Sequence, residues 1–154
     1  MQKIFEHTID LSGHANLTRE LLWAGLEDFA HNPHEYVESM QASRVSACPS
    51  DDGRKRLARE LDFGGSLVVS DVAELLAPER LTTLVPASGP IPESRLDITI
   101  EEDEAGAFKL HFEYFETTNA EAAGLSAAMQ GLRQKAWLAK DQSLAQQLLA
   151  ALCD

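Results

Sequence analysis

The chain has 154 residues, which is typical of one domain. Its 44% hydrophobic and 25% charged residues are typical of a globular protein and exclude a disordered one. Twenty-five acidic residues against 13 basic ones give a formal net charge of −12, which excludes proteins that bind nucleic acid or anionic membrane surfaces through clustered Lys and Arg. With two cysteines, no signal-peptide pattern and no apolar run of membrane-spanning length, we expect a single cytoplasmic domain over residues 1–154, without membrane insertion.

The N-terminal part predicts one strand followed by helical segments. Apolar and polar side chains alternate over residues 3–11, the period-two pattern of a half-buried strand. Thr18 is a suitable N-cap for an amphipathic helix of about three turns. Pro33 ends this helix, and a short second helical segment is expected over residues 34–37.

The middle of the chain predicts a meander of six strands joined by turns. These strands are expected at residues 41–48, 54–63, 66–76, 81–86, 96–100 and 108–114. Gly64-Gly65 predicts a two-residue hairpin turn, because both central positions of a type I′ turn need positive φ.

Residues 119–152 are rich in Ala, Leu and Gln and contain no Pro, which predicts a C-terminal helix. One apolar stripe consists of Leu125, Met129, Leu132 and Ala136, and a second, rotated stripe of Trp137, Leu144 and Leu148. Gly124 and Gly131 weaken the first half. We therefore expect either one kinked helix or a loose segment followed by a helix from about residue 133.

Together these elements predict an α+β domain. A seven-stranded antiparallel sheet with one apolar face must bury that face, and the long C-terminal helix is the natural cover. Twisted sheets curl, and a straight helix leaves a hollow that must be filled by large side chains or remain a cavity. Only 6% of the residues are aromatic and the helix is rich in Ala, which favours a cavity.

Several stretches carry a resemblance to a known family. They read FEHTI at residues 5–9, LTRELLWAGL at 17–26, RELDFG at 59–64 and SRLDITIEE at 94–102. In these stretches and in the order of its elements the chain resembles the AtaL-type branch of the START-like (SRPBCC, birch-pollen-allergen-like) superfamily. The resemblance implies the helix-grip fold, with a curved seven-stranded sheet, two short helices after the first strand and a long C-terminal helix over the sheet. It also implies an apolar cavity, and it supplies no catalytic residues.

The candidate ligand-binding residues are taken from the apolar faces of the predicted strands and helix. We expect the cavity to be lined by Phe5, Ile9, Leu67, Ile98, Leu110, Phe112, Tyr114 and Met129. His7 and Tyr114 share these faces, so both polar side chains would orient a ligand. Each also has a purely structural interpretation, as a core side chain whose polar atoms are hydrogen-bonded to neighbours.

Asp71 is a further candidate, because it is in phase with Val69. A carboxylate on the cavity face is costly unless it is paired or protonated, and is therefore noteworthy. A bulge would instead turn it outward and leave Ser70 and Val72 on the inner face. Arg59 is expected to form surface ion pairs with acidic neighbours.

Three functions are compatible with this sequence. The first is the binding of a small hydrophobic or aromatic metabolite. The second is an enzyme of the cyclase or lyase type, in which His7 with Asp71 or Tyr114 forms an acid–base pair. The third is a structural or partner-binding domain with a filled core and no ligand.

Cofactor and metal motifs are not found in the sequence. There is no GxSxG, Walker, Rossmann or HExxH pattern, so no cofactor is expected. His31 and His34 invite a metal interpretation, but Pro33 prevents a continuous helix from presenting both on one face. We therefore predict no metal site, and the sequence leaves the oligomeric state open.

Overall fold

The computed structural model describes residues 1–14, 16–48, 54–88, 92–117 and 127–152. In chain order its elements are β1 (Gln2–Asp10), α1 (Arg19–His31), the 3-10 helix η1 (Pro33–Glu35), β2 (Ala42–Cys48), β3 (Lys55–Asp62), β4 (Val68–Leu76), β5 (Arg80–Val85), β6 (Ser94–Glu102), β7 (Phe108–Glu116) and α2 (Ala127–Leu152). The predicted order of strands and helices is confirmed.

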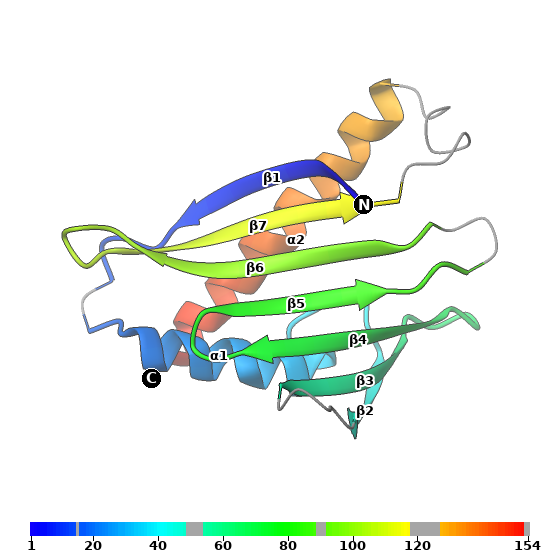
Figure 1. The fold of residues 1–154 in the computed structure, drawn as a ribbon, viewed down its shortest axis with the longest axis horizontal. Helices are drawn as coiled ribbons and strands as arrows, with labels where there is room; N and C mark the ends of the chain where they lie inside the picture. The colour runs from blue at the N-terminus through cyan, green and yellow to red at the C-terminus, as the bar shows by residue number, and fades with distance from the viewer. Residues whose placement is uncertain (15, 49–53, 89–91, 118–126, 153–154) are drawn as a thin grey trace.

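The seven strands form one antiparallel sheet in the order β1-β7-β6-β5-β4-β3-β2. Strands β2 to β7 follow one another as a meander, and β1 pairs with β7, so that the first and last strands are neighbours. The helices lie on one face of this curved sheet, and α2 crosses it diagonally (Figure 1). This is the predicted helix-grip fold. Among the described residues, no helix combines the length and the apolar character needed to span a membrane.

The first helix forms as its sequence predicts. Thr18 is the N-cap, and its Oγ1 accepts a hydrogen bond from the backbone N–H of Leu21 at 3.1 Å. Its buried side chains recur every three or four residues and face the core: Leu22, Trp23, Leu26 and Ala30. The helix ends at His31, and Pro33 begins η1.

Alternation along the strands sets which face of the sheet is apolar. On β7 the side chains of Phe108, Leu110, Phe112 and Tyr114 are buried against the helices. The residues between them point to the outer face, where polar side chains such as His111 lie. A shift in register between Lys3 and Phe5 interrupts the pairing of β1 with β7 and leaves Ile4 as the extra residue.

The turn between β3 and β4 is longer than predicted. The outermost pair of the two strands is Asp62 with Val68, so five residues connect them. Positive φ values occur at Gly64 (82°), Gly65 (60°) and also Ser66 (73°). The left-handed turn therefore needs three residues, whereas a type I′ turn would need two.

Helix α2 is continuous over Ala127–Leu152, so of the two predicted alternatives the one with a helix that begins only near residue 133 is wrong. The predicted stripe of Leu125, Met129, Leu132 and Ala136 is wrong at Met129 and Leu132, which are 52% and 67% exposed. Gly124 and Leu125 lie outside the described residues. The second stripe is right: Leu144 and Leu148 are buried in the main core. At the crossing with α1, a Cβ added at Gly25 would lie 2.9 Å from Leu148 Cδ2. Glycine therefore permits the close approach of the two helices.

Candidate functional site

A cavity of about 560 Å³ lies between the inner face of the sheet and helix α2, within the size range of small-molecule sites. Its strand-derived wall comes mainly from β3 to β7, and loop 37–40 with the end of α1 contributes further apolar side chains. The apolar lining includes Phe29, Val37, Met40, Leu61, Val69, Val85, Leu96, Ile98, Trp137 and Leu144. A site of this composition can take up an apolar molecule of metabolite size.

Helix α2 supplies the opposite wall through one of its faces. The residues that line the cavity are Arg133, Ala136, Trp137, Lys140, Asp141 and Leu144. Their spacing of three and one residues is that of a single helical stripe. The ring of Trp137 stacks on that of Tyr114 from β7, with 4.4 Å between centroids and 13° between planes. Helix and sheet therefore meet through an aromatic pair at the cavity wall.

Asp141 is the centre of a polar network beside this aromatic pair. Its Oδ2 accepts a hydrogen bond from the Tyr114 hydroxyl at 2.6 Å and lies 2.8 Å from His7 Nε2. The imidazole of His7 stacks on Phe112, with 4.9 Å between centroids. Asp141 is 1% exposed, so one carboxyl oxygen that is shielded from bulk water holds two polar side chains of the sheet.

The surroundings of Asp141 shift the acidities of this network. Burial raises the pKa of Asp141, and the nearby Lys140 charge and the hydrogen bonds from Tyr114 and His7 offset this only in part. Burial, together with the Asp141 charge and hydrogen bond, raises the pKa of Tyr114 well above its usual value. The tyrosine therefore stays protonated, and Asp141 is the group able to exchange a proton nearer neutral pH.

A buried ion pair forms another part of the wall. Arg59 on β3 and Asp71 on β4 are directly opposed in the sheet and are 5% and 4% exposed. Their contact is bidentate, with Nε to Oδ1 at 2.7 Å and Nη2 to Oδ2 at 2.8 Å. Arg59 Nη1 also donates to the carbonyl of Ala30 at the C-terminal end of α1, at 3.0 Å, where the helix dipole favours a cation. Asp71 therefore faces the cavity and is paired.

Lys140 brings a second cation to the α2 wall. Its ammonium lies 5.5 Å from the centroid of the Tyr114 ring, a cation–π contact. The Lys140 side chain lines the cavity and is exposed to solvent.

The structure places the sequence-predicted site residues in three groups. Asp71, Ile98 and Tyr114 line the cavity. A second set shares the inner face without reaching the cavity and consists of Phe5, His7, Ile9, Leu110 and Phe112. Leu67 and Met129 are exposed by 56% and 52%, so their assignment to the lining is wrong.

The reason for the second group is the path of α2. Leu110 and Phe112 are fully buried, and they share their core cluster with Leu144, Ala145 and Leu148 of the helix. The C-terminal part of α2 therefore packs against the sheet at this end, and the α2 residues that line the cavity lie between Arg133 and Leu144. His7 nevertheless joins the cavity wall indirectly, because Asp141 connects it to Tyr114.

Most of the wall residues were not proposed from the sequence, among them Arg59, Trp137, Lys140 and Asp141. Signals existed for two of them. Arg59 alternates in phase with Leu57 and Leu61, which places it on the inner face and contradicts the expected surface pairing. Asp141 falls at helical spacing between Trp137 and Leu144, so it is an acidic residue within an apolar stripe.

Among the described residues, one group on the outer face has the composition of a metal site. It consists of Glu6, His111 and Glu113, whose ligand atoms all lie within 4.8 Å of one another. Lys3 Nζ lies 3.2 Å from the Glu6 carboxylate and 3.5 Å from that of Glu113. An ammonium thus already occupies the position from which a cation would neutralise these carboxylates, and the group is separate from the cavity.

Known proteins match this chain at two levels. Residues 6–150 match the model of the family described as acetylaranotin biosynthesis cluster protein L (AtaL). Curated proteins gave no match. Three similar solved structures are the di-domain ARO/CYC StfQ from the steffimycin biosynthetic pathway, the Zhui aromatase/cyclase from Streptomyces sp. R1128, and Ara h 8.0201.

The structural similarities extend over the whole fold at low identity. The TM-score to StfQ is 0.67 at 11% identity, over 96% of this chain and 49% of that one, so this chain spans about half the length of StfQ. Zhui gives 0.61 at 11% identity, over 98% and 93%, and Ara h 8.0201 gives 0.56 at 10%, over 97% and 99%. These identities show the fold alone. The family model covers almost the entire sequence, and the chain, which has the helix-grip fold, therefore belongs to the AtaL family.

Proposed function

We propose that this protein binds a small hydrophobic or aromatic metabolite in the cavity between the sheet and α2. The observation that carries this proposal is the cavity itself, about 560 Å³ in volume and lined mainly by apolar side chains. A domain with only a structural or partner-binding role would be more stable with this space filled, because the atoms that line an empty space lose packing contacts.

The walls fit a flat or aromatic molecule. The Trp137–Tyr114 stack offers an aromatic surface, and Leu96 and Ile98 form an aliphatic one opposite α2. The family takes its description from a biosynthetic cluster, and StfQ comes from a biosynthetic pathway. These relationships support a biosynthetic intermediate or product as the ligand.

A cyclase-type enzyme is the second candidate, and Asp141 is the observation that favours it. A carboxyl group in the cavity wall with a raised pKa is a candidate proton donor or acceptor toward a bound molecule. Asp141 would then replace the predicted pairing of His7 with Asp71, since Asp71 is engaged by Arg59. Two of the similar structures are aromatase/cyclases, or ARO/CYC proteins, by description.

Native mass spectrometry of the freshly purified protein tests the binding proposal, followed by denaturing extraction of any bound molecule. We expect either a reproducible small-molecule adduct or, for the ligand-free protein, saturable binding of the uncharged dye Nile red. The Ala136→Trp variant should weaken both, because residue 136 lines the cavity and the indole would occupy part of the space that the ligand needs.

Ala139→Trp is the matched control, because residue 139 is exposed on the same helix but does not line the cavity. It should bind like the wild type. Equal binding by both tryptophan variants, or no binding by the wild type, would overturn the proposal. A change in the extracted or added molecule on incubation, lost in Asp141→Asn while binding persists, would instead favour the enzyme.

A further inference from the structure

The charged side chains of the cavity wall are not equally paired. Arg59 is held by Asp71 at 2.7 Å, and Arg133 is held by Glu116 at 2.7 Å. Arg95 lies 3.4 Å from Asp97. Within the part of the chain that the structure describes, Lys140 alone of the cavity-lining cations forms no ion pair with a carboxylate.

The acidic neighbours of Lys140 are engaged elsewhere. Asp141 follows it in sequence, but its Oδ2 takes the hydrogen bond from Tyr114 and lies beside His7. Glu116 receives two contacts from Arg133 Nη2, at 2.7 and 2.8 Å. The ammonium instead lies near the face of the Tyr114 ring. A cation–π contact of this kind stabilises the charge but leaves the three ammonium hydrogens without an anionic acceptor.

We propose that Lys140 binds a carboxylate of the ligand, so that the cavity selects apolar molecules that carry an acidic group. This inference rests on the proposed ligand-binding function and adds the chemical class of the ligand. The carboxylate would sit beside the Lys140 ammonium at the α2 wall, and the apolar body would lie against Trp137, Leu96 and Ile98.

A ligand that enters the cavity displaces water from the unpaired Lys140 ammonium. A ligand carboxylate would replace this hydration through a charge-assisted hydrogen bond with the ammonium. A neutral ligand of the same shape would fill the cavity but would give the ammonium no anionic acceptor. Selection between the two therefore depends on Lys140 and not on the apolar walls.

Two fluorescent probes of matched shape test this inference: anthracene-9-carboxylate and its uncharged analogue anthracene-9-carboxamide. The wild type should bind the carboxylate about 10-fold more tightly, the usual effect of one hydrogen bond to a charged group. Lys140→Met should lower the affinity for the carboxylate by about 10-fold and change that for the carboxamide less than about twofold. Lys140→Arg keeps the charge and should retain the preference.

Lys135→Met is the control, because Lys135 is exposed on the same helix and does not line the cavity. It should leave both affinities unchanged. If both probes bind the wild type equally, or if Lys140→Met weakens both alike, the inference is wrong while the binding function stands. If neither probe binds, the proposed function fails as well.

Discussion

The buried contact between Arg59 and Asp71 shows how a charged pair is tolerated inside a small apolar domain. Two unit charges lose most of their hydration at 5% and 4% exposure. The bidentate geometry and the additional bond to the Ala30 carbonyl supply three well-formed hydrogen bonds in return. Replacing either residue alone would be destabilising, because the substitution would leave the other residue as an uncompensated buried charge.

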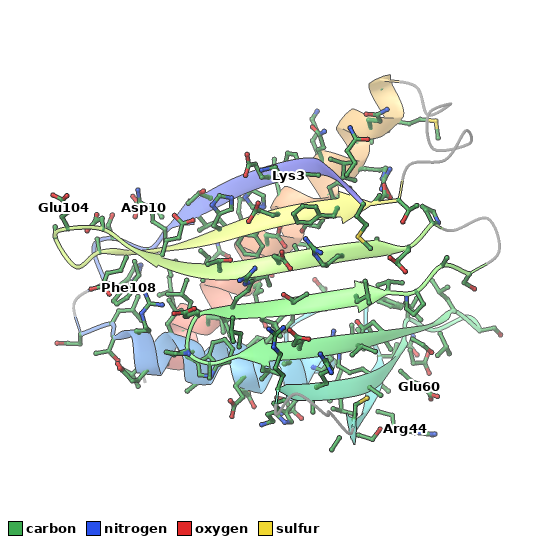
Figure 2. All side chains as sticks on the ribbon, in the orientation of Figure 1. Lys3, Asp10, Arg44, Glu60, Glu104 and Phe108 are labelled. Atoms are coloured by element: carbon green, nitrogen blue, oxygen red, sulfur yellow. The ribbon has the colours of Figure 1, made fainter. Side chains whose placement is uncertain are left out.

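Arg59→Met should therefore lower the free energy of unfolding by about 3–5 kcal/mol in urea titrations, because Asp71 is left buried without a partner. The double variant with Asp71→Leu removes both charges and should recover most of this loss. Arg44→Met is the control at an exposed pair, Arg44 with Glu60, and should cost less than about 0.5 kcal/mol. Figure 2 shows both residues of this control at the sheet edge away from α2. Equal costs for Arg59→Met and Arg44→Met would contradict the buried pairing.

At the scale of the elements, His111 joins three strands on the outer face of the sheet. Its Nδ1 lies 2.7 Å from Glu101 on β6, and its Nε2 lies 2.9 Å from Glu6 on β1. Both ring nitrogens donate only in the imidazolium form, so the arrangement favours the charged state. Burial lowers the pKa of His111, but the hydrogen bonds to Glu6 and Glu101 and the charges of Glu101 and Glu113 outweigh this and raise it overall.

The raised pKa of His111 predicts how stability changes with pH. Above the unfolded-chain pKa of about 6.5, the folded protein binds more protons than the unfolded chain, so stability falls as the pH rises through the folded pKa. The contribution is fully present only below that unfolded value. We expect His111→Thr to remove this decline when the free energy of unfolding is measured from about pH 6 to about pH 9.

The decline in the free energy of unfolding over the same pH range should also be smaller in the Glu6→Gln, Glu101→Gln double variant, which keeps the imidazole and removes both carboxylates that it contacts. If wild type and both variants have parallel profiles, the bridge does not hold the strands through the charged imidazole.

The elements themselves were largely predictable, because they depend on local periodicity. Alternation places Ile98 and Tyr114 on the inner face without knowledge of any distant residue, and Thr18 sets the start of α1. Hydrophobicity was a poorer guide on α2. Leu132 is 67% exposed although it is apolar, and it lies outside the stripe of α2 that lines the cavity.

The cavity wall was less predictable, since it depends on where α2 crosses the sheet. Phe112 and Tyr114 are two residues apart on one face of β7, yet only Tyr114 lines the cavity. That difference arises from residues 30 positions away on α2, which no local pattern reports. Lys140 and Asp141 gain their roles in the same way, through contacts with Tyr114 that form only in the folded sheet and helix.

For the whole molecule, the excess of acidic residues opposes compact folding. Twenty-five carboxylates against 13 cations leave a net charge of −12 on one domain. Ion pairs on the surface, such as that between Lys3 and Glu6, compensate part of this charge locally. Each exposed pair contributes about 0.5 kcal/mol or less, and salt weakens it. Salt also weakens the repulsion among the unpaired charges, so the two effects oppose each other.

Their magnitudes determine the sign of the salt effect. Added salt lowers the Coulomb repulsion energy of both states, and it lowers that of the compact folded state more. For the folded and unfolded radii expected at this length, the difference between about 0.01 and 0.15 M NaCl is on the order of 3 kcal/mol in favour of the folded state. A few partly screened surface pairs lose less than this. We therefore expect the free energy of unfolding in urea to rise with NaCl over this range, and sucrose of equal osmolarity, which does not screen charge, serves as the control. A fall with added salt would mean that the acidic side chains are paired well enough for their attraction to exceed the repulsion of the net charge.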